Sequence, residues 1–451
     1  MKKLSLVFAA LFFCCGLVAQ EITLEDIWVK GTFRSKSIAG IRSMNNGVNY
    51  CILTSEGIEK YSYSDGKKVE TIVSFSALKF NTDKEYVFEY EFNGDETKVL
   101  LATNPQFIYR RSYLANYYVY DLSSKQITPI DNEKVRLADF SPNGSMVAYV
   151  KDNNIYVLSL VDKTVRQITT DGEYNHTING TTDWVYEEEF AITKGFFWSP
   201  DSEKIAFYSF DESNVKEFTI PYYGTLYPVQ YSYKYPKAGE DNSIIGIHVF
   251  DLKTATTHDI DLGPNKDIYV PRLQWTPNNE VFVHKLNRHQ NHYELFLVNC
   301  NDYRLSKIYD ERNECYIEQA ENVTFLADKQ HFIIKSEKDG YMNLYKVNIY
   351  TKEIEPITSG KYDVDQICYI DPKTEQIYFT AAQSEAYNRE LLVVDKKKKV
   401  KKLSGKVGTY TADFSANGKY YISSFSDTDT PTIYTINDNT GKVLLTLEDN
   451  K

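Results

Sequence analysis

Three consecutive glutamates stand between aromatic residues near the middle of the chain, in the stretch TDWVYEEEF from Thr182 to Phe190. Adjacent side chains of a β-strand point to opposite faces, so neighbouring carboxylates of a strand cannot converge on one small cation. In a helical turn, neighbours are about 100° apart and can flank one point in space. Asp183 is a suitable N-cap, and acidic side chains favour the first turn of a helix. The stretch therefore predicts a short helix, pinned to the body of the protein by Trp184, Tyr186 and Phe190.

A cation must accompany such a group, because two carboxylates held close together raise each other's pKa unless they are compensated. The stretch FIYRRSYLANYY contains Arg110 and Arg111 among aromatic residues and offers one internal source of positive charge. If two glutamates face one arginine, the group is neutral only when it binds a further cation such as an ammonium ion. The alternative is a surface helix with three solvated glutamates, and the residue types leave both interpretations open.

Other chemistry is missing from the sequence. There is no Gly-x-Ser-x-Gly elbow, no phosphate-binding glycine loop, no HExxH motif and no EF-hand loop. Of the seven histidines, His289 and His292 are the closest pair, but their surroundings are typical of a hairpin turn rather than of a metal site. We therefore expect no catalytic residue, no Ser-Asp-His triad, no metal and no cofactor in this chain.

The composition is that of a soluble globular protein of 451 residues with a formal net charge of −11. An acidic chain without a basic stripe is not expected to bind nucleic acid. The only basic run, from Lys396 to Lys402, stands between two strand-like segments and is predicted to be a solvated turn.

Residues 1–19 are predicted to be a signal peptide, with Lys2 and Lys3 before an apolar stretch that is too short for a transmembrane helix. The mature protein is therefore expected to be exported, into the periplasm or the medium, and no other window predicts a membrane span. Four cysteines remain after cleavage. Cys300 and Cys315 are close enough in sequence to pair, and two separate thiols are an equally open alternative.

A repeated pattern organises the rest of the chain. An aromatic or apolar residue is followed by a turn with Pro, Asn, Asp or Gly and then by a β-rich strand. The copies begin at Met44, Phe92, Phe140, Trp198, Trp275, Phe325, Ile370 and Phe414. Most are about 45 to 58 residues apart, which is the size of a four-stranded propeller blade. The strands alternate apolar and polar residues, and helical periodicity is nearly absent.

We therefore predict an all-β fold, an eight-bladed β-propeller over residues 21–451 with a short helical insertion that carries the acidic motif. Two unrelated β-sandwiches would not share one turn motif at this spacing. The longest interval, between Trp198 and Trp275, contains a Tyr- and Pro-rich insertion from Glu217 to Asn242. It is expected to project as an arm, and a projecting aromatic arm favours contact with a partner surface.

Several stretches resemble the N-terminal propeller of the dipeptidyl peptidase IV family. They are INGTTDWVYEEEF (Ile178 to Phe190), FFWSPDSEKIAF, YPKAG (Tyr235 to Gly239), YRRSYLANYYVYDL (Tyr109 to Leu122) and LLTLEDN (Leu444 to Asn450). The resemblance covers roughly Glu21 to the end of the chain. It implies an eight-bladed propeller that caps an α/β-hydrolase domain with a Ser-Asp-His triad. Such serine exopeptidases release N-terminal dipeptides with proline or alanine second.

The resemblance also assigns roles to particular residues. It implies that Glu188 and Glu189 bind the free α-ammonium of a peptide, that Arg110 contacts a carbonyl near the peptide's N-terminus, and that Glu187 supports the helix. It further implies a homodimer formed through the arm. The Phe-Arg pair found in a later blade of animal members is missing from the corresponding stretch CYIEQAENVTF.

The matched stretches end at LEDNK, about where a hydrolase domain would begin in the family. We therefore expect that domain C-terminal to this chain, which would then be the substrate-gating part of a dipeptidyl peptidase. The alternative is a stand-alone, non-catalytic propeller that binds peptides or a protein partner.

Overall fold

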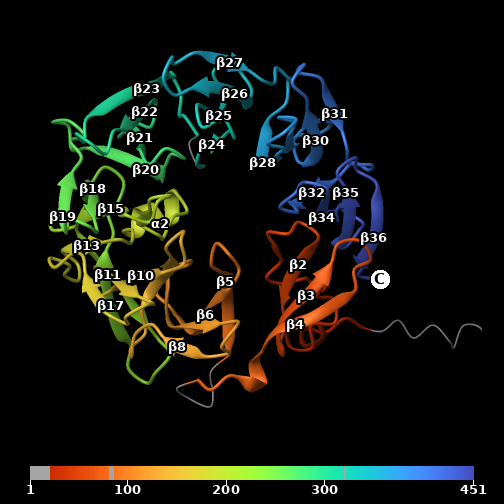
Figure 1. Ribbon diagram of the computed structural model, residues 1–451, viewed down its shortest axis with the longest axis horizontal. Coiled ribbons are helices and arrows are strands. Elements are labelled where there is room, and N and C mark those ends of the chain that lie inside the picture. The colour runs from red at the N-terminus through yellow and green to blue at the C-terminus, as the bar shows by residue number, and fades with distance from the viewer. Residues whose placement is uncertain (1–20, 81–85, 319–320) are drawn as a thin grey trace, which may run out of the picture.

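The sheets of this computed structural model follow one another around a ring, with the colour running in order from the first blade to the last (Figure 1). The structure describes residues 21–80, 86–318 and 321–451. The predicted signal peptide lies outside these residues. Eight sheets of four or five strands form the ring, which confirms the predicted eight-bladed, all-β propeller.

Each blade is an antiparallel sheet built mainly from strands that are consecutive in sequence. The first four blades are β1 (Arg42–Ser43), β2 (Asn49–Leu53), β3 (Gly57–Ser62) and β4 (Lys68–Ser74); β5 (Val87–Phe92), β6 (Lys98–Phe107), β7 (Tyr113–Asp121) and β8 (Ile127–Pro129); β9 (Arg136–Phe140), β10 (Met146–Lys151), β11 (Asn154–Ser159) and β12 (Val165–Gln167); and β13 (Thr177–Asn179), β14 (Phe196–Trp198), β15 (Lys204–Asp211), β18 (Ile244–Asp251) and β19 (Thr256–Asp259).

The last four blades continue in the same order. They are β20 (Ile268–Trp275), β21 (Val281–Asn287), β22 (His292–Val298) and β23 (Leu305–Arg312); β24 (Thr324–Phe325), β25 (His331–Ser336), β26 (Asn343–Asn348) and β27 (Ile354–Pro356); β28 (Val364–Ile370), β29 (Ile377–Ala381), β30 (Glu390–Val394) and β31 (Val400–Lys402); and β32 (Thr409–Tyr410), β33 (Asp413–Phe414), β34 (Tyr420–Ser426), β35 (Ile433–Asp438) and β36 (Val443–Glu448).

The repeated turn of the sequence has the same place in every blade. Each copy lies where the chain turns back into the next strand of the blade, as between β9 and β10 at Phe140. Turns of neighbouring blades touch. A Cβ on Gly144, whose φ is +67°, would lie 2.5 Å from the side-chain nitrogen Nδ2 of Asn93. Gly47, with φ +66°, is equally close to the side chain of Asn417. The repeat therefore forms the tight turns and also joins successive blades.

Side chains, rather than a shared strand, join the first and last blades. Every strand of the first blade is N-terminal and every strand of the last is C-terminal. Asn450 exchanges hydrogen bonds of 2.7 and 3.0 Å with the backbone of Lys36, and the rings of Tyr63 and Tyr420 stack at 5.6 Å. These contacts hold the two ends of the described chain next to each other.

Two insertions interrupt the fourth blade. The helix α2 (Trp184–Glu189) stands between β13 and β14, on the inner side of the ring beside β20 (Figure 1). A separate hairpin of β16 (Glu217–Tyr222) and β17 (Val229–Lys234) stands between β15 and β18 and forms the predicted arm. Residues at its tip are widely exposed, with Leu226 at 92% and Tyr227 at 80%.

Other helical elements are short: a π-helix at Glu25–Val29 and a 3-10 helix at Phe75–Ala77. No helix among the described residues has the length and hydrophobicity needed to cross a bilayer. Cys300 and Cys315 are free thiols, so the open question of their pairing resolves to separate cysteines. In the basic run, the ammonium of Lys402 donates a hydrogen bond to the fully buried carboxylate of Glu390. This lysine is therefore part of the folded structure and not merely solvated.

Candidate functional site

The acidic motif forms the short helix that its sequence predicts. Asp183 is the N-cap: its backbone is extended, and its Oδ1 accepts a hydrogen bond of 2.9 Å from the N–H of Tyr186. Its Oδ2 accepts a second one, of 2.7 Å, from the hydroxyl of Ser243. Burial raises the pKa of Asp183 to about 6. The cap therefore fixes the start of the helix with a carboxyl group that has little contact with water.

Two residues of strand β20, in the next blade, hold the helix by hydrogen bonds. The hydroxyl oxygen of Tyr186, a fully buried side chain, accepts a hydrogen bond of 2.7 Å from the N–H of Val270. At the C-terminal end, the guanidinium of Arg272 donates to the carbonyl of Phe190 at 2.8 Å. A cation at this position also complements the negative end of the helix dipole. Sequence reasoning placed Tyr186 and Phe190 against a blade, but it missed both partners because they lie about 84 and 82 residues away.

The three glutamates have three different environments, because successive residues of a helix project in different directions. Glu187 is completely buried, and its Oε1 accepts hydrogen bonds of 2.7 Å from the N–H of Arg111 and 2.8 Å from that of Ser112. Its Oε2 is buried and has no partner among the described residues. Glu187 therefore fastens the loop between β6 and β7, which carries Arg110, to the helix.

Glu188 pairs with Arg110. The distance from its Oε2 to Nε of Arg110 is 3.1 Å, and the glutamate side chain is 17% exposed against 72% for the arginine. An ion pair so open to water contributes little to stability by itself. Its effect is local: one arginine stands beside the acidic helix, as the charge argument from sequence required.

Glu189 is exposed, and across the described residues its carboxylate has no hydrogen-bond or ion-pair partner. It lines a cavity of about 710 Å³ between the helix, the arm and β20. The aromatic walls of this cavity include Trp184 and Tyr235, whose rings are 4.2 Å apart. Glu188, Glu189 and Arg110 together carry a net charge of −1, and Lys237 and Arg288 also line the cavity.

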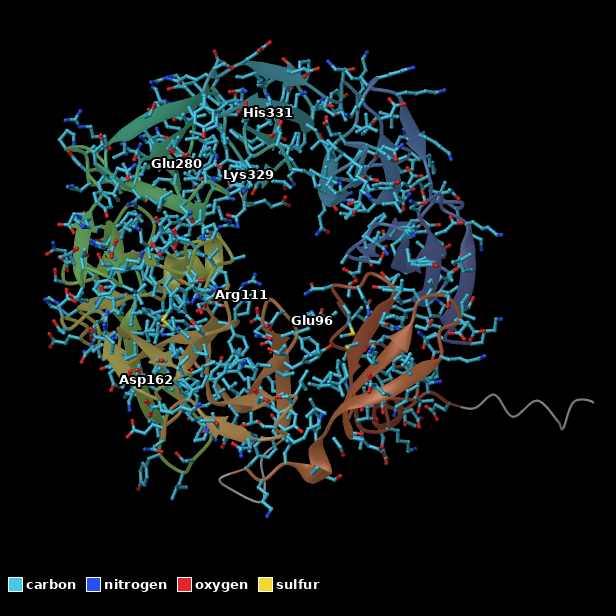
Figure 2. The ribbon with its side chains drawn as sticks, viewed as in Figure 1. Glu96, Arg111, Asp162, Glu280, Lys329 and His331 are labelled. Atoms are coloured by element: carbon cyan, nitrogen blue, oxygen red, sulfur yellow. The ribbon has the colours of Figure 1, made fainter. Side chains whose placement is uncertain are left out.

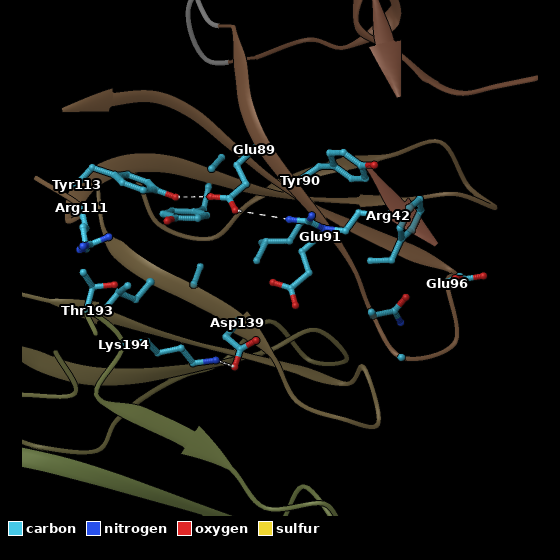
Figure 3. Close-up of a pocket in the computed structure, with 18 of the residues that line it drawn as sticks. Arg42, Glu89, Tyr90, Glu91, Glu96, Arg111, Tyr113, Asp139, Thr193 and Lys194 are labelled. Carbon is cyan, nitrogen blue, oxygen red and sulfur yellow. Dashed lines mark hydrogen bonds and ion pairs between the residues drawn. The ribbon is translucent and has the colours of Figure 1, made fainter. Parts of the chain in front are cut away.

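A second cavity, of about 650 Å³, adjoins the same loop at the inner end of the second blade (Figure 3). Its lining contains acidic and basic side chains: Tyr113 donates to Glu89 at 2.7 Å, and the ammonium of Lys194 donates to Asp139. Burial raises the pKa of Glu91 there, and Asp139 raises it further. In Figure 2 Arg111, which also lines this cavity, lies at the inner edge of the ring.

The fourth blade contains a hydrogen-bonded Ser–His–Asp series that sequence analysis did not find. The Oγ of Ser209 is 2.7 Å from Nε2 of His248, and Nδ1 of His248 is 2.7 Å from Asp259. The expectation from sequence concerned a catalytic triad, and it stays a prediction. The signal was weak in the sequence because the residues come from three strands, β15, β18 and β19.

This series has the features of a structural connection. Ser209 lies within a regular ladder, paired with Asn179 on one side and Gly246 on the other, so nearby N–H groups serve the sheet and not an oxyanion. Asp259 is 83% exposed. None of the three residues lines the cavities described above. We assign it the role of joining three strands.

The group of possible metal ligands around His292 does not include His289. It lies with Glu294 and Asp310 in a group whose ligand atoms are within 4.8 Å of one another. The ammonium of Lys307 stands in the same group, 2.6 Å from Asp310 and 3.2 Å from Glu294. This lysine neutralises the carboxylates, and the group is an ion-pair network on the surface of the fifth blade.

Known proteins with related sequences are dipeptidyl peptidases. A probable dipeptidyl peptidase 4 of Arthroderma benhamiae is 29% identical over 76% of this chain, and one of Aspergillus fumigatus is 28% identical over 94%. The chain covers 46% and 58% of these two proteins, about half their length.

Solved structures give the same relationship. The crystal structure of Porphyromonas gingivalis dipeptidyl peptidase 4 has a TM-score of 0.90 and 36% identity, covering 96% of this chain and 62% of that one. A putative dipeptidyl aminopeptidase IV from Bacteroides ovatus has a TM-score of 0.74 at 21% identity, which supports the fold alone. The family described as "Dipeptidyl peptidase IV (DPP IV) N-terminal region" matches residues 93–432. The chain therefore belongs to the dipeptidyl peptidase IV N-terminal region family.

Proposed function

We propose that this chain is the substrate-gating propeller of a serine exopeptidase and that Glu188 and Glu189 bind the free α-ammonium of a peptide. The observation that carries the proposal is the exposed carboxylate of Glu189, which has no partner among the described residues and is one residue from a glutamate already paired with Arg110. An ammonium ion brings the charge of the group to zero and satisfies the acceptors that the protein leaves free. Arg110, in turn, has donors left for a carbonyl near the peptide's N-terminus.

Fixing the ammonium would measure the peptide from its end. One residue of extended chain spans at most ~3.3–3.6 Å, so the second peptide bond lies ~7 Å from the ammonium. A nucleophile at that distance cuts after residue two and releases a dipeptide, with proline or alanine second in the family. A blocked N-terminus brings no positive charge to Glu189, so the peptide would lose its charge-assisted hydrogen bonds and bind more weakly.

Calorimetric titration with the tripeptide Ala-Pro-Ala and its N-acetylated form tests the site. We expect the free peptide to bind and the acetylated peptide to bind at least tenfold more weakly. Glu188→Gln and Glu189→Gln should each remove most of the difference. Glu203→Gln is a matched control, because Glu203 is ion-paired with Lys253 at a turn of the same blade. Equal binding of both peptides to the unaltered chain would refute the proposal.

The active serine would belong to an α/β-hydrolase domain C-terminal to this chain. Support comes from exposed apolar side chains near the start of the described chain: Leu24, Trp28 and Val29 are 74%, 74% and 79% exposed. The segment that carries them leads into Lys36, which contacts Asn450. The alternative is a stand-alone propeller that binds peptides or a protein partner. A Gly-x-Ser-x-Gly motif in the coding sequence after Lys451 would favour the first, and a stop codon the second.

The arm is proposed to form a homodimer. Its tip exposes Tyr223, Leu226 and Tyr227 to 77%, 92% and 80%. Replacing residues 223–228 by a short Gly-Ser linker should convert a dimer into a monomer in light scattering. A dimer that persists after this replacement would count against the arm as the interface.

We also propose that the protein is exported to the periplasm or the medium, as its first 19 residues indicate. Cell fractionation of the native host, followed by N-terminal sequencing of the mature protein, tests this. A cytoplasmic protein that retains Met1 would contradict it.

A further inference from the structure

A third cavity, of about 430 Å³, lies on the other side of Trp184 from the cavity of Glu189. The N-terminus of α2 forms one wall, β17 of the arm another, and the loop before β7 a third. It takes no part in the ammonium site proposed above, because it contains neither Glu188 nor Glu189.

A buried carboxyl group faces this cavity. Glu212, just after β15, is 7% exposed, and its side chain has no hydrogen-bond or ion-pair partner within the described parts of the chain. Burial raises its pKa to about 8, with Asp183 and Asp211 adding to the effect and Lys234 opposing it. The ammonium of Lys234 is engaged elsewhere, 2.8 Å from the carbonyl of Val215. A buried acid without a partner is rare in folded proteins and marks a place for a donor from outside the chain.

Four aromatic side chains also contribute to the lining of this cavity. Tyr109, Tyr174, Tyr231 and Trp184 all line the cavity, and Tyr109 is close enough to Tyr231, Tyr174 and Glu212 for each to raise its pKa. A carboxylate at the base of an aromatic cage is the combination that recognises organic cations, through charge and through the faces of the rings.

The charge of the lining also favours a cation. Asp152, Glu173, Asp183 and Glu212 contribute acids, whereas Arg136 is the one basic residue among the described residues of the lining. Burial lowers the pKa of Arg136, and the strongest opposing influence is Glu187. The carboxylate of Glu187, which does not line this cavity, offsets part of this effect, although Nε of Arg136 has no hydrogen-bond partner among the described residues.

We propose that this cavity binds a small alkylammonium ion, with its N–H groups on the carboxylate of Glu212 and its alkyl group against Tyr109, Tyr231 and Trp184. It is a second cation site, separated from the peptide site by one side chain of α2. Before binding, the buried side chain of Glu212 holds a proton. The alkylammonium ion displaces this proton, so Glu212 is ionised in the complex. The charged groups near that acid are Asp183, Asp211 and Lys234, with the hydroxyl of Tyr109.

Calorimetric titration of the whole chain with butylammonium chloride tests the proposal, using the variant Glu188→Gln/Glu189→Gln to silence the peptide site. We expect this variant to retain one site. At pH 7, binding should release up to about one proton, measured as a difference between buffers of different ionisation heat.

Glu212→Gln, added to that double variant, should weaken binding by about 10- to 100-fold and abolish the proton release. Tyr231→Ala should weaken it by about fivefold. Glu203→Gln serves as the control and should change nothing. The proposal is overturned if Glu212→Gln binds butylammonium as well as its parent, or if the parent binds none. Failure of the peptide site has a different signature: free and acetylated peptides bind alike while the Glu212 site persists.

Discussion

Replacement of Glu187 by alanine should release the loop that carries Arg110. The carboxylate accepts two backbone hydrogen bonds, of 2.7 and 2.8 Å, in a fully buried position. A hydrogen bond to a charged group contributes about 1.5–3 kcal/mol, and alanine leaves both N–H groups without an acceptor. Part of this loss is offset because the substitution also removes the buried Oε2, which has no hydrogen-bond partner among the residues that the structure describes. We expect a net loss of about 3–5 kcal/mol in the free energy of unfolding.

Amide hydrogen exchange measures this loss at the bonds themselves. If about 3 kcal/mol of local stability disappears, protection of the Arg111 and Ser112 amides should fall by more than about 100-fold. Glu187→Gln keeps the shape and one acceptor oxygen, and a neutral acceptor is roughly half as strong. Its loss should therefore be about half as large. Urea unfolding of both variants provides the global value.

Glu189→Ala is the matched control, because it lies on the same helix but is exposed and has no partner among the described residues. It should change stability by less than about 0.5 kcal/mol. The reasoning would be refuted if Glu187→Ala left the two amides protected, or if both alanine variants were equally destabilised. Either result would mean that burial and hydrogen bonding of Glu187 do not hold the loop.

Four further predictions concern the same region. Peptide binding should weaken as the pH rises above about 8 in calorimetric titrations, because an α-amino group has a pKa of about 7.7–8.0 and loses its charge there; affinity unchanged at pH 9.5 would contradict this. The pKa of Asp183 is raised to about 6 in the folded state, so its contribution lowers the unfolding free energy as pH rises from about 4 to 6. Asp183→Asn should remove that decrease, by up to about 3 kcal/mol, when denaturation of both proteins is compared at pH 4 and pH 7. Arg272→Met should destabilise the fold by about 1–3 kcal/mol, since the carbonyl of Phe190 loses a buried donor, and a melting temperature equal to that of the parent would speak against this role. The chain alone should release no chromophore from a Gly-Pro anilide, and turnover abolished by Ser209→Ala would show that the series Ser209–His248–Asp259 is catalytic after all.

Local chemistry was enough to predict the repeat and the helix. The turn at Phe140 and its seven counterparts lie between two strands of a blade, as the sequence pattern predicts. The pattern is visible in the sequence because a tight reversal demands particular residue types at fixed positions. Asp183 begins the helix because an N-cap bonds to an amide only three residues away. Features of this kind depend on neighbours along the chain, so they are visible without any tertiary information.

Partners from distant strands could not be predicted. The sequence shows three glutamates of one type, and only the packed ring makes Glu187 a buried acceptor, Glu188 half of an ion pair and Glu189 an exposed carboxylate. The surroundings of Glu212 could not be predicted either, because the aromatic side chains near it come from a loop, a helix and the arm. Burial and desolvation are properties of the assembled blades. The sequence by itself determined which charges exist, and the tertiary structure decided which of them are satisfied, because that depends on what each meets across the ring.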